Sequence, residues 1–282
     1  MRLFLRDIRI EHTLFALPFA YVGAVMGARG LPTLAQLAWI TVAVVGARTA
    51  AMAANRFFDR RIDATNPRTA NRPTASGALH PRVMLVAIAG GLLVTAVAAW
   101  NLNPLCVVLL PLAALGILFY PLCKRFTWGA HFVLGAVDGF APLGAFIAVT
   151  GSVTFPSILL FLAVTVWVAG FDILYAMMDY DVDRAQNLRS IPVRFGERAS
   201  RSLPLGLHAA MSVMLLLAGL LAEATPFYFV GVALAVVLVG YERRLIGLAA
   251  NVFALNERVF TTNMAFSVAF MLTTLVAYTL AR

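Results

Sequence analysis

Acidic side chains recur at helical spacing near position 60 of the chain. Asn55, Asp59 and Asp63 are four residues apart, so on a helix they lie on one face, one above the other. Two carboxylates stacked in this way repel each other unless a cation lies near them. Only oxygen donors are present in the motif, and these favour a hard ion such as Mg²⁺ or Ca²⁺. The three residues are therefore candidate metal ligands, and the two aspartates are also candidate catalytic groups.

A second acidic segment, FDILYAMMDYDVDRAQNLR, repeats the pattern more than 100 residues later. If one helix runs through it, Asp172, Tyr175, Asp179 and Asp183 share a single stripe. Two carboxylate pairs, each at the end of an apolar helix, could then face each other across a cleft. A polyanion bridged to both pairs by metal ions is the occupant that such a cleft would suit. Asp179 and Asp183 complete the candidate metal and catalytic set.

Basic and aromatic residues accompany these acids. Arg68 and Arg72 follow the first motif, at a spacing suited to binding phosphate. Tyr120 lies four residues before Lys124, which would place its ring beside a phosphate site. The face of an aromatic ring attracts positive charge, so Tyr120 is a candidate for stabilising a carbocation.

Two charged residues fall inside apolar runs. Arg48 is 7 residues before Asn55 and 11 before Asp59, so it shares their helical face. A charged residue in mid-membrane costs about 2.5–3.5 kcal/mol on insertion scales, and it must face the bundle interior. Arg48 either forms an internal salt bridge, to Asp59 or Asp172, or recognises an anionic group of a substrate. Asp138 is a second intramembrane acid, for which a hydrogen bond within the bundle is the simpler role.

The composition indicates a membrane protein. Of 282 residues, 61% are hydrophobic and 12% are charged, whereas soluble domains carry about 25% charged residues. Apolar runs of about 20 residues recur along the chain, as expected of membrane-spanning helices. The two cysteines and four histidines form neither a disulfide framework nor a zinc pattern. We therefore predict an all-α, polytopic membrane protein without a soluble domain.

Nine membrane spans are predicted, with short turns on one side and longer connections on the other. The segment before span 1 has three Lys or Arg residues, and the connections after spans 2, 4, 6 and 8 have six, two, five and three, out of 22 in the chain. By the positive-inside rule the N-terminus and both acidic motifs are cytoplasmic. The net charge of +9 thus reflects orientation in the bilayer, and we predict no nucleic-acid partner. The predicted spans are 12–28, 35–59, 82–100, 104–121, 130–149, 156–179, 203–222, 226–241 and 262–281.

The motifs in combination resemble those of the UbiA superfamily of intramembrane aromatic prenyltransferases. The residues that carry the resemblance are N-x-x-x-D-x-x-x-D followed by NPRTANRP, Y-x-x-x-K at Tyr120 and Lys124, and D-x-x-Y-x-x-x-D-x-x-x-D from Asp172. The opening EHTLFALPFAYVGAV is also similar to members that are 4-hydroxybenzoate polyprenyltransferases. The resemblance covers nearly the whole chain, residues 1–282, as a single domain. Two details differ from the common pattern: Arg189 stands where many members have lysine, and ANRPTASG replaces NRPLPSG.

The resemblance implies a nine-helix bundle around a central cavity that opens laterally to lipid. It implies two Mg²⁺ ions that bridge a polyprenyl diphosphate to Asn55, Asp59, Asp63, Asp179 and Asp183. The diphosphate would be held by Arg68, Arg72, Lys124 and Arg189. The acceptor, an aromatic acid, would meet Arg48, Asp172 and Tyr175. The expected reaction is the magnesium-dependent transfer of a prenyl chain to the acceptor ring in the prokaryotic plasma membrane, on its cytoplasmic side.

Other acceptors and other classes of membrane protein are the alternatives to this expectation. Within the family, the acceptor is most simply 4-hydroxybenzoate, and a naphthoate of the menaquinone route is the alternative. Heme farnesylation fits less well, because its usual motif resembles NYxxD rather than the NRFFD found here. A transporter is the alternative from a different class, but transporters place ionisable groups at broken helices near the midplane. A membrane phosphotransferase would carry a D-G-x-x-A-R signature that this sequence lacks. The sequence defines no oligomeric state.

Overall fold

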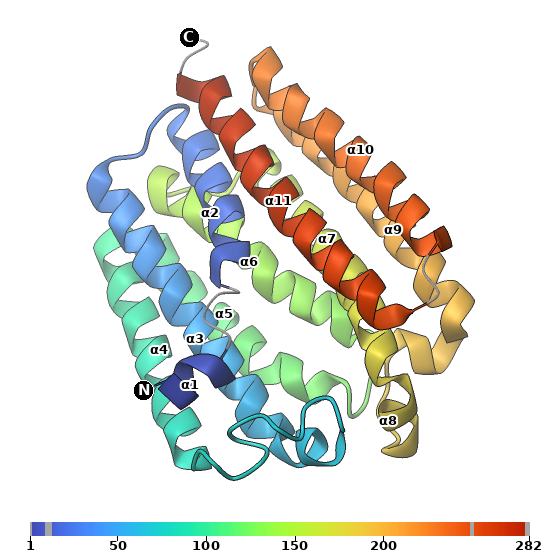
Figure 1. The fold of residues 1–282 in the computed structure, drawn as a ribbon. Helices are drawn as coiled ribbons and strands as arrows, with labels where there is room; N and C mark the ends of the chain where they lie inside the picture. The colour runs from blue at the N-terminus through green and yellow to red at the C-terminus, as the bar shows by residue number, and fades with distance from the viewer. Residues whose placement is uncertain (1, 9–12, 249–250, 280–282) are drawn as a thin grey trace.

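A computed structural model describes residues 2–8, 13–248 and 251–279 of the chain. All regular elements within these ranges are helices. Figure 1 shows the long helices packed side by side, with α1, α8 and the long loop after α3 gathered at one end of the bundle. The elements are α1 (Arg2–Asp7), α2 (Thr13–Ala28), α3 (Leu34–Thr65), α4 (Pro81–Leu102), α5 (Pro104–Cys123), α6 (Ala130–Thr150), α7 (Phe155–Ala176), η2 (Met177–Asp179), α8 (Tyr180–Ala185), α9 (Ile191–Leu221), α10 (Pro226–Leu248) and α11 (Val252–Thr279).

The helices bear out the predicted membrane architecture. In the described part of the chain, seven helical segments are long and apolar enough to cross a membrane, and Ala16–Ala28 is a shorter apolar helix. Each of the nine predicted spans overlaps one helix: α2, α3, α4, α5, α6, α7, α9, α10 or α11. The prediction of an all-α, polytopic membrane protein is therefore confirmed.

Local sequence signals fix where the helices begin. Thr33 and Gln36 form a reciprocal capping box at the start of α3, which satisfies backbone N–H groups that the first helical turn leaves unpaired. At the start of α5 the Asn103 side chain accepts from the backbone N–H groups of Leu105 and Cys106. Helices α4, α5, α7, α9 and α10 have proline in their first turn, where its missing N–H costs nothing.

Small residues let the central helices approach closely. A Cβ atom added to Gly23 of α2 would lie 2.1 Å from the backbone oxygen of Pro142 in α6. One added to Gly135 of α6 would lie 2.1 Å from the backbone oxygen of Thr165 in α7. Both glycines therefore allow a close approach of neighbouring helices that a larger side chain would prevent. Helix α6 thus lies tightly between α2 and α7, where it can carry polar side chains into the interior.

A fully buried polar network holds the C-terminal half together. His208 of α9 lies with Nδ1 2.5 Å from the Glu242 carboxylate of α10, and its Nε2 donates to the backbone oxygen of Trp167 in α7. Asn263 of α11 donates to Glu242 and accepts from the Trp167 indole. Each polar group in this network has a partner, as burial in a bilayer requires.

Two predicted boundaries differ from the structure. Helix α3 continues to Thr65, six residues beyond the predicted end of span 2, because the charged residues of the first motif remain helical. Helix α9 begins at Ile191 rather than near 203, and it is kinked at Gly196, whose φ of 79° lies in a region that favours glycine. The chain is therefore helical from Ile191 onward, ahead of the predicted start of span 7.

Candidate active site

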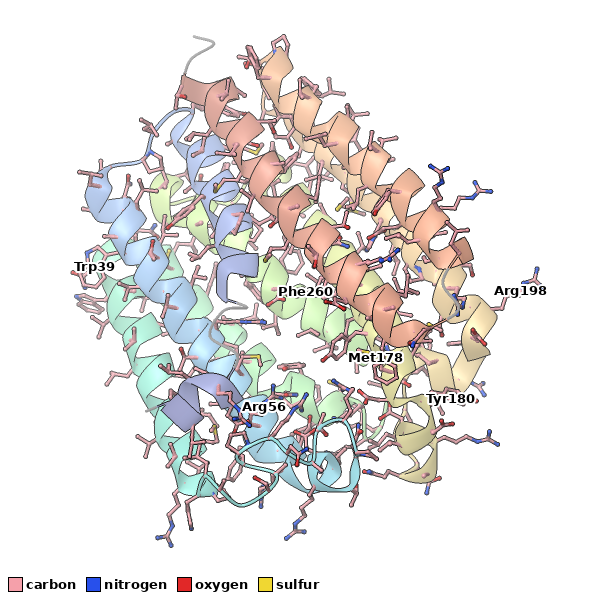
Figure 2. All side chains as sticks on the ribbon, in the orientation of Figure 1. Trp39, Arg56, Met178, Tyr180, Arg198 and Phe260 are labelled. Atoms are coloured by element: carbon pink, nitrogen blue, oxygen red, sulfur yellow. The ribbon has the colours of Figure 1, made fainter. Side chains whose placement is uncertain are left out.

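One polar cavity of about 270 Å³ lies at the end of the bundle where the acidic motifs meet. Its walls come from α3, α5, α6, α7, η2, α8, α11, the loop 66–80 and the segment before α9. Figure 2 places Arg56 at this end of the bundle, whereas Arg198 points away from it. All thirteen predicted site residues line this one cavity: Arg48, Asn55, Asp59, Asp63, Arg68, Arg72, Tyr120, Lys124, Asp172, Tyr175, Asp179, Asp183 and Arg189.

Asp59 is the most deeply buried carboxylate of the first motif. Its side chain is 3% exposed, and its Oδ2 lies 2.7 Å from Lys124 Nζ at the end of α5. Asn55 donates to the same oxygen over 3.0 Å. The other oxygen, Oδ1, is buried and has no hydrogen-bond partner in the described structure, although Arg125 Nη2 is 3.6 Å away. A buried carboxylate oxygen left in this state has unused capacity to bind a cation.

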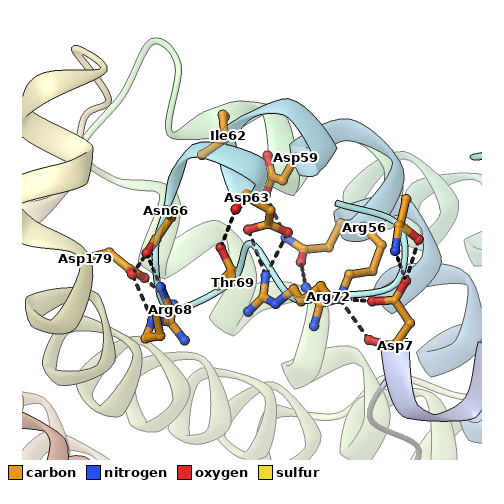
Figure 3. Close-up of polar contacts among 12 residues, drawn as sticks. Asp7, Arg56, Asp59, Ile62, Asp63, Asn66, Arg68, Thr69, Arg72 and Asp179 are labelled. Atoms are coloured by element: carbon orange, nitrogen blue, oxygen red, sulfur yellow. Dashed lines mark hydrogen bonds and ion pairs between the residues drawn. The ribbon is translucent and has the colours of Figure 1, made fainter. Parts of the chain in front are cut away.

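Asp63 is held by the loop that follows it. Both of its carboxylate oxygens accept from Arg72 Nη1 at 2.8 Å. The hydroxyl of Thr69 donates to the Asp63 backbone oxygen, at the end of α3. Figure 3 shows the loop folded back over this helix end, so that its arginines face the carboxylates. The first motif and its arginines therefore form one compact unit.

The same loop reaches the second motif. Asn66 Nδ2 and Arg68 Nε both donate to Asp179 Oδ1, at 2.7 and 2.9 Å, and Arg68 Nη2 pairs with the second oxygen (Figure 3). Arg68 also donates to the Tyr175 hydroxyl and lies over its ring. Burial alone lowers the pKa of the Arg68 guanidinium, but its hydrogen bonds to Asp179 and the charges of Tyr175 and Asp179 raise that pKa above its usual value.

The second motif does not lie on one continuous helix, which corrects the predicted stripe. Helix α7 ends at Ala176, a 3₁₀ turn covers Met177–Asp179, and α8 begins at Tyr180. Asp179, with φ −106° and ψ 7°, is outside the helical region. Its carboxylate accepts hydrogen bonds from Asn66 and Arg68 of the loop 66–80. The break turns Asp179 and Asp183 toward the first motif, so that they still line the same cavity.

Arg48 has a different partner from those predicted. Its Nη1 lies 3.5 Å from Oδ1 of Asp138 in α6, so neither Asp59 nor Asp172 forms the expected salt bridge. Asp138 reaches Arg48 from α6, whereas Asp59 is already paired with Lys124 and Asp172 with His131. Asp138 thus serves as the counter-charge of Arg48.

His131 is a site residue that the sequence reasoning missed. It lines the cavity, and its Nδ1 lies 2.7 Å from Asp172 Oδ2. The backbone N–H of Ile191, at the start of α9, donates to His131 Nε2 over 3.2 Å. Because Nε2 accepts a hydrogen bond, the ring proton is on Nδ1 and is donated to Asp172. A sequence signal was present, since His131 and Asp138 are seven residues apart and share one face of an apolar helix.

Arg56 is a second residue that was missed. It is buried and lines the cavity. Its Nη1 donates to Asn55 Oδ1, and its Nε donates to the backbone oxygen of Asp7 in α1. The Asp7 carboxylate in turn accepts from the backbone N–H of Thr74 in the loop 66–80. Helix α1 therefore fixes both Arg56 and the loop, a contact over 49 residues that sequence spacing does not reveal.

The predicted metal ligands suit Mg²⁺ in their chemistry. They offer only carboxylate and amide oxygens, the donors that a hard divalent cation prefers, and Asp59 Oδ1 is unpaired. No cluster of three or more His, Cys, Asp or Glu side chains in the described ranges is close enough to hold an ion. Instead, the protein's own cations pair with these carboxylates: Lys124 with Asp59, Arg72 with Asp63, and Arg68 with Asp179.

Comparison with known proteins identifies relatives over most of the chain. The 4-hydroxybenzoate octaprenyltransferase of Alkalilimnicola ehrlichii is 34% identical over 230 residues, covering 79% of this chain and 76% of that protein. The enzyme of the same name from Pseudoalteromonas translucida is 32% identical over 259 residues, covering 89% and 85%.

Solved structures of UbiA homologues also match nearly the whole chain. The apo structure of a UbiA homologue from Aeropyrum pernix K1 is 34% identical, has a TM-score of 0.86, and covers 95% of this chain and 98% of its own. A UbiA homologue from Archaeoglobus fulgidus bound to GPP and Mg²⁺ has a TM-score of 0.75 at 18% identity, covering 97% and 99%, and therefore supports the fold alone.

The family assignment follows from these matches. Residues 16–254, well over half of the chain, match the model of the UbiA prenyltransferase family. This match favours a prenyltransferase over the transporter and phosphotransferase alternatives. The chain belongs to the UbiA prenyltransferase family and is an integral membrane prenyltransferase.

Proposed function

We propose that this protein transfers a prenyl chain from a polyprenyl diphosphate to an aromatic acid, most simply 4-hydroxybenzoate, in quinone biosynthesis. The observation that carries the proposal is that both acidic motifs and six basic residues line one cavity at one end of a membrane bundle. The names of the relatives from A. ehrlichii and P. translucida support the acceptor. The A. fulgidus structures bound to GPP and to DMAPP, each with Mg²⁺, support the donor and the metal.

The carboxylates and the basic residues divide the work of binding the diphosphate. In this proposal Asn55, Asp59, Asp63, Asp179 and Asp183 hold Mg²⁺, which when bound neutralises charge on the leaving diphosphate. Arg68, Arg72, Lys124 and Arg189 donate hydrogen bonds to the same group. Positive charge placed where negative charge develops lowers the barrier to breaking the allylic C–O bond. Arg72 and Lys124 each lie 2.8 Å or less from a carboxylate, so they are already at the site.

The acceptor ring must attack the allylic carbon in a space that excludes water, because water would otherwise capture the cation. Tyr120, Tyr175 and Phe171 line the cavity, and their ring faces can stabilise positive charge. Arg48 binds the carboxylate of the acceptor, and Asp172, held by His131, faces the ring. After the C–C bond forms, the ring loses a proton to a cavity aspartate or to the released diphosphate and becomes aromatic again.

The proposal places the protein in a prokaryotic plasma membrane, with the cavity on the cytoplasmic side. This orientation rests on the excess of Lys and Arg at the end of the bundle that carries both motifs. An isoprenoid tail is too apolar for water, and a site within the bundle lets the tail remain in the bilayer while the diphosphate enters from the cytoplasmic side.

The test is to incubate the purified protein with Mg²⁺, a polyprenyl diphosphate and a panel of aromatic acids that includes 4-hydroxybenzoate and a hydroxynaphthoate. We expect mass spectrometry to find prenylated 4-hydroxybenzoate, and we expect a chelator to stop the reaction. Product from the naphthoate alone would assign the acceptor to the menaquinone route instead. Turnover that continues with a chelator would contradict the role of the metal.

A further inference from the structure

Arg48 and Asp138 lie where two cavities meet. Besides the polar cavity, the structure has a mainly apolar cavity of about 170 Å³ among α3, α4, α5 and α6. Both residues line both cavities. They are the only charged side chains, among the described residues, that line the apolar one. A molecule that reaches from one cavity into the other must therefore pass this pair.

The pair leaves hydrogen-bonding capacity unused. Arg48 Nη1 and Asp138 Oδ1 are 3.5 Å apart, and the two side chains are 17% and 16% exposed. Arg48 Nε is buried and has no hydrogen-bond partner in the described structure. The contact therefore balances charge without satisfying the donors of the guanidinium, and a ligand group can still bind to them.

We propose that Asp138 is a specificity-determining residue, which reduces the preference of Arg48 for acceptors that carry an ionised carboxylate. The inference rests on the proposed role of Arg48 in binding the acceptor. A carboxylate bound to the guanidinium comes close to Asp138, and two like charges in a poorly screened interior repel each other. A ring with a neutral substituent is not subject to this repulsion, so it competes more effectively than it would against an unpaired Arg48.

The same residue explains how Arg48 is accommodated. An uncompensated arginine in mid-membrane is costly, and Asp138 supplies its counter-charge from the neighbouring helix α6. Compensation and selectivity thus oppose each other: the charge that lets Arg48 remain inside the bundle also weakens its attraction for an anionic acceptor. The identity of residue 138 therefore sets how strongly the site prefers a charged acceptor over a neutral one.

The experiment compares the binding of 4-hydroxybenzoate with that of 4-hydroxybenzamide, a neutral molecule of the same shape. Both are titrated calorimetrically, without prenyl donor, into the wild type, Asp138→Asn, Arg48→Gln and the double variant. We expect Asp138→Asn to raise the preference for benzoate over benzamide at least tenfold, about 1.4 kcal/mol. In the Arg48→Gln background the same change should leave the preference unaltered, because Asp138 acts through Arg48.

Several outcomes would overturn the proposal. These are an unchanged preference, a shift toward the amide, an equal shift in both Arg48 backgrounds, and a wild type that binds neither molecule. Asp138→Glu, which keeps the charge, should retain the wild-type preference even if Asp138→Asn does not fold. Asp181→Asn, at an exposed position of α8, is the matched control. Since binding is measured without the donor, a protein that binds both acceptors but transfers no prenyl chain would refute the proposed function and leave this inference standing.

Discussion

Carboxylates of both acidic motifs pair with Lys or Arg side chains of the protein in the cavity. Asp59 is the clearest case, because Lys124 pairs with one of its oxygens while the other remains buried and unbonded. In a site that binds a metal–diphosphate complex, such an oxygen is available to the metal. Lys124 and Asn55 both contact the Asp59 carboxylate, and a neutral replacement removes its negative charge from the cavity.

We predict that Asp59→Ala lowers the rate of prenyl transfer at least about a hundredfold, the scale on which loss of one preorganised electrostatic contact acts. The protein should still insert, since the change removes a carboxylate at a helix end and no apolar span. The rate is measured with radiolabelled prenyl diphosphate, and insertion by the amount of detergent-extracted monodisperse protein. Asp181→Ala, at an exposed position outside the cavity, is the control. Full activity of Asp59→Ala would exclude this residue from the metal site.

A second prediction concerns His131, which donates a proton on Nδ1 to Asp172. His131→Ala should lower kcat about tenfold and change KM for the prenyl donor little, because Asp172 would lose its fixed orientation while the diphosphate contacts remain. His131→Asn should recover part of the loss, since its amide N–H can occupy the position of Nδ1. Steady-state kinetics on the three proteins decide the question. Equal kcat values for all three would show that His131 only packs.

The helices themselves could be predicted well from the sequence, and their mutual contacts could not. Apolar runs and prolines locate the long helices, and the four-residue spacing correctly stacks Asn55, Asp59 and Asp63. The break at Met177–Asp179 was missed because the spacing of its acids fits a continuous helix. It arises from contacts with the loop 66–80, more than 100 residues earlier. Likewise, the pairing of Arg48 with Asp138 depends on how α3 and α6 face each other, which periodicity does not specify.

The network of His208, Glu242, Asn263 and Trp167 shows the same limit. Its members lie on four helices, and none of the spacings between them marks a motif. His208 Nε2 must carry a proton, because it donates to a backbone oxygen, and Nδ1 is hydrogen-bonded to Glu242. The exposed fraction of both side chains is 0%, and a Cβ at Gly170 would lie 2.4 Å from His208 Nε2. The close approach of α7 and α9 is thus part of the network.

We predict that Glu242→Leu destabilises the protein strongly. It leaves His208 and Asn263 buried without their partner, and breaking a buried charge pair from one side costs about 3–5 kcal/mol. The midpoint of thermal unfolding in detergent should fall by several degrees or more. Glu257→Leu, at an exposed position of α11, introduces the same side chain and should change the midpoint little. Similar midpoints for the two variants would mean that the network contributes nothing to stability.

At the scale of the whole molecule, one end of the bundle brings together segments from almost the entire chain. Helix α1 fixes Arg56 and the loop 66–80 through Asp7, and that loop joins the two acidic motifs through Arg68 and Arg72 (Figure 3). The result is a cavity in which acidic and basic groups are already paired before any substrate is present. A metal ion that binds alone competes with a protein cation at Asp59, Asp63 and Asp179, whereas one that arrives with diphosphate brings a new partner for that cation.

This arrangement predicts that Mg²⁺ binds weakly on its own and that removing a competing cation strengthens its binding. Arg72 pairs with both oxygens of Asp63, so Arg72→Gln frees that carboxylate. We expect the Arg72→Gln variant to bind Mg²⁺ without diphosphate at least tenfold more tightly than the wild type does. The affinity is measured by equilibrium dialysis or by competition with Mn²⁺ detected by electron paramagnetic resonance.

The control is Arg184→Gln, which removes one positive charge at an exposed position of α8. It should have little effect on Mg²⁺ affinity, because Arg184 is not paired with a proposed metal ligand. If the wild type and both variants bind Mg²⁺ equally, the prediction that Arg72 and the metal compete for Asp63 is wrong. If affinity does rise in Arg72→Gln while prenyl transfer falls, the same arginine acts in turn as a counter-charge for Asp63 and as a ligand of the diphosphate.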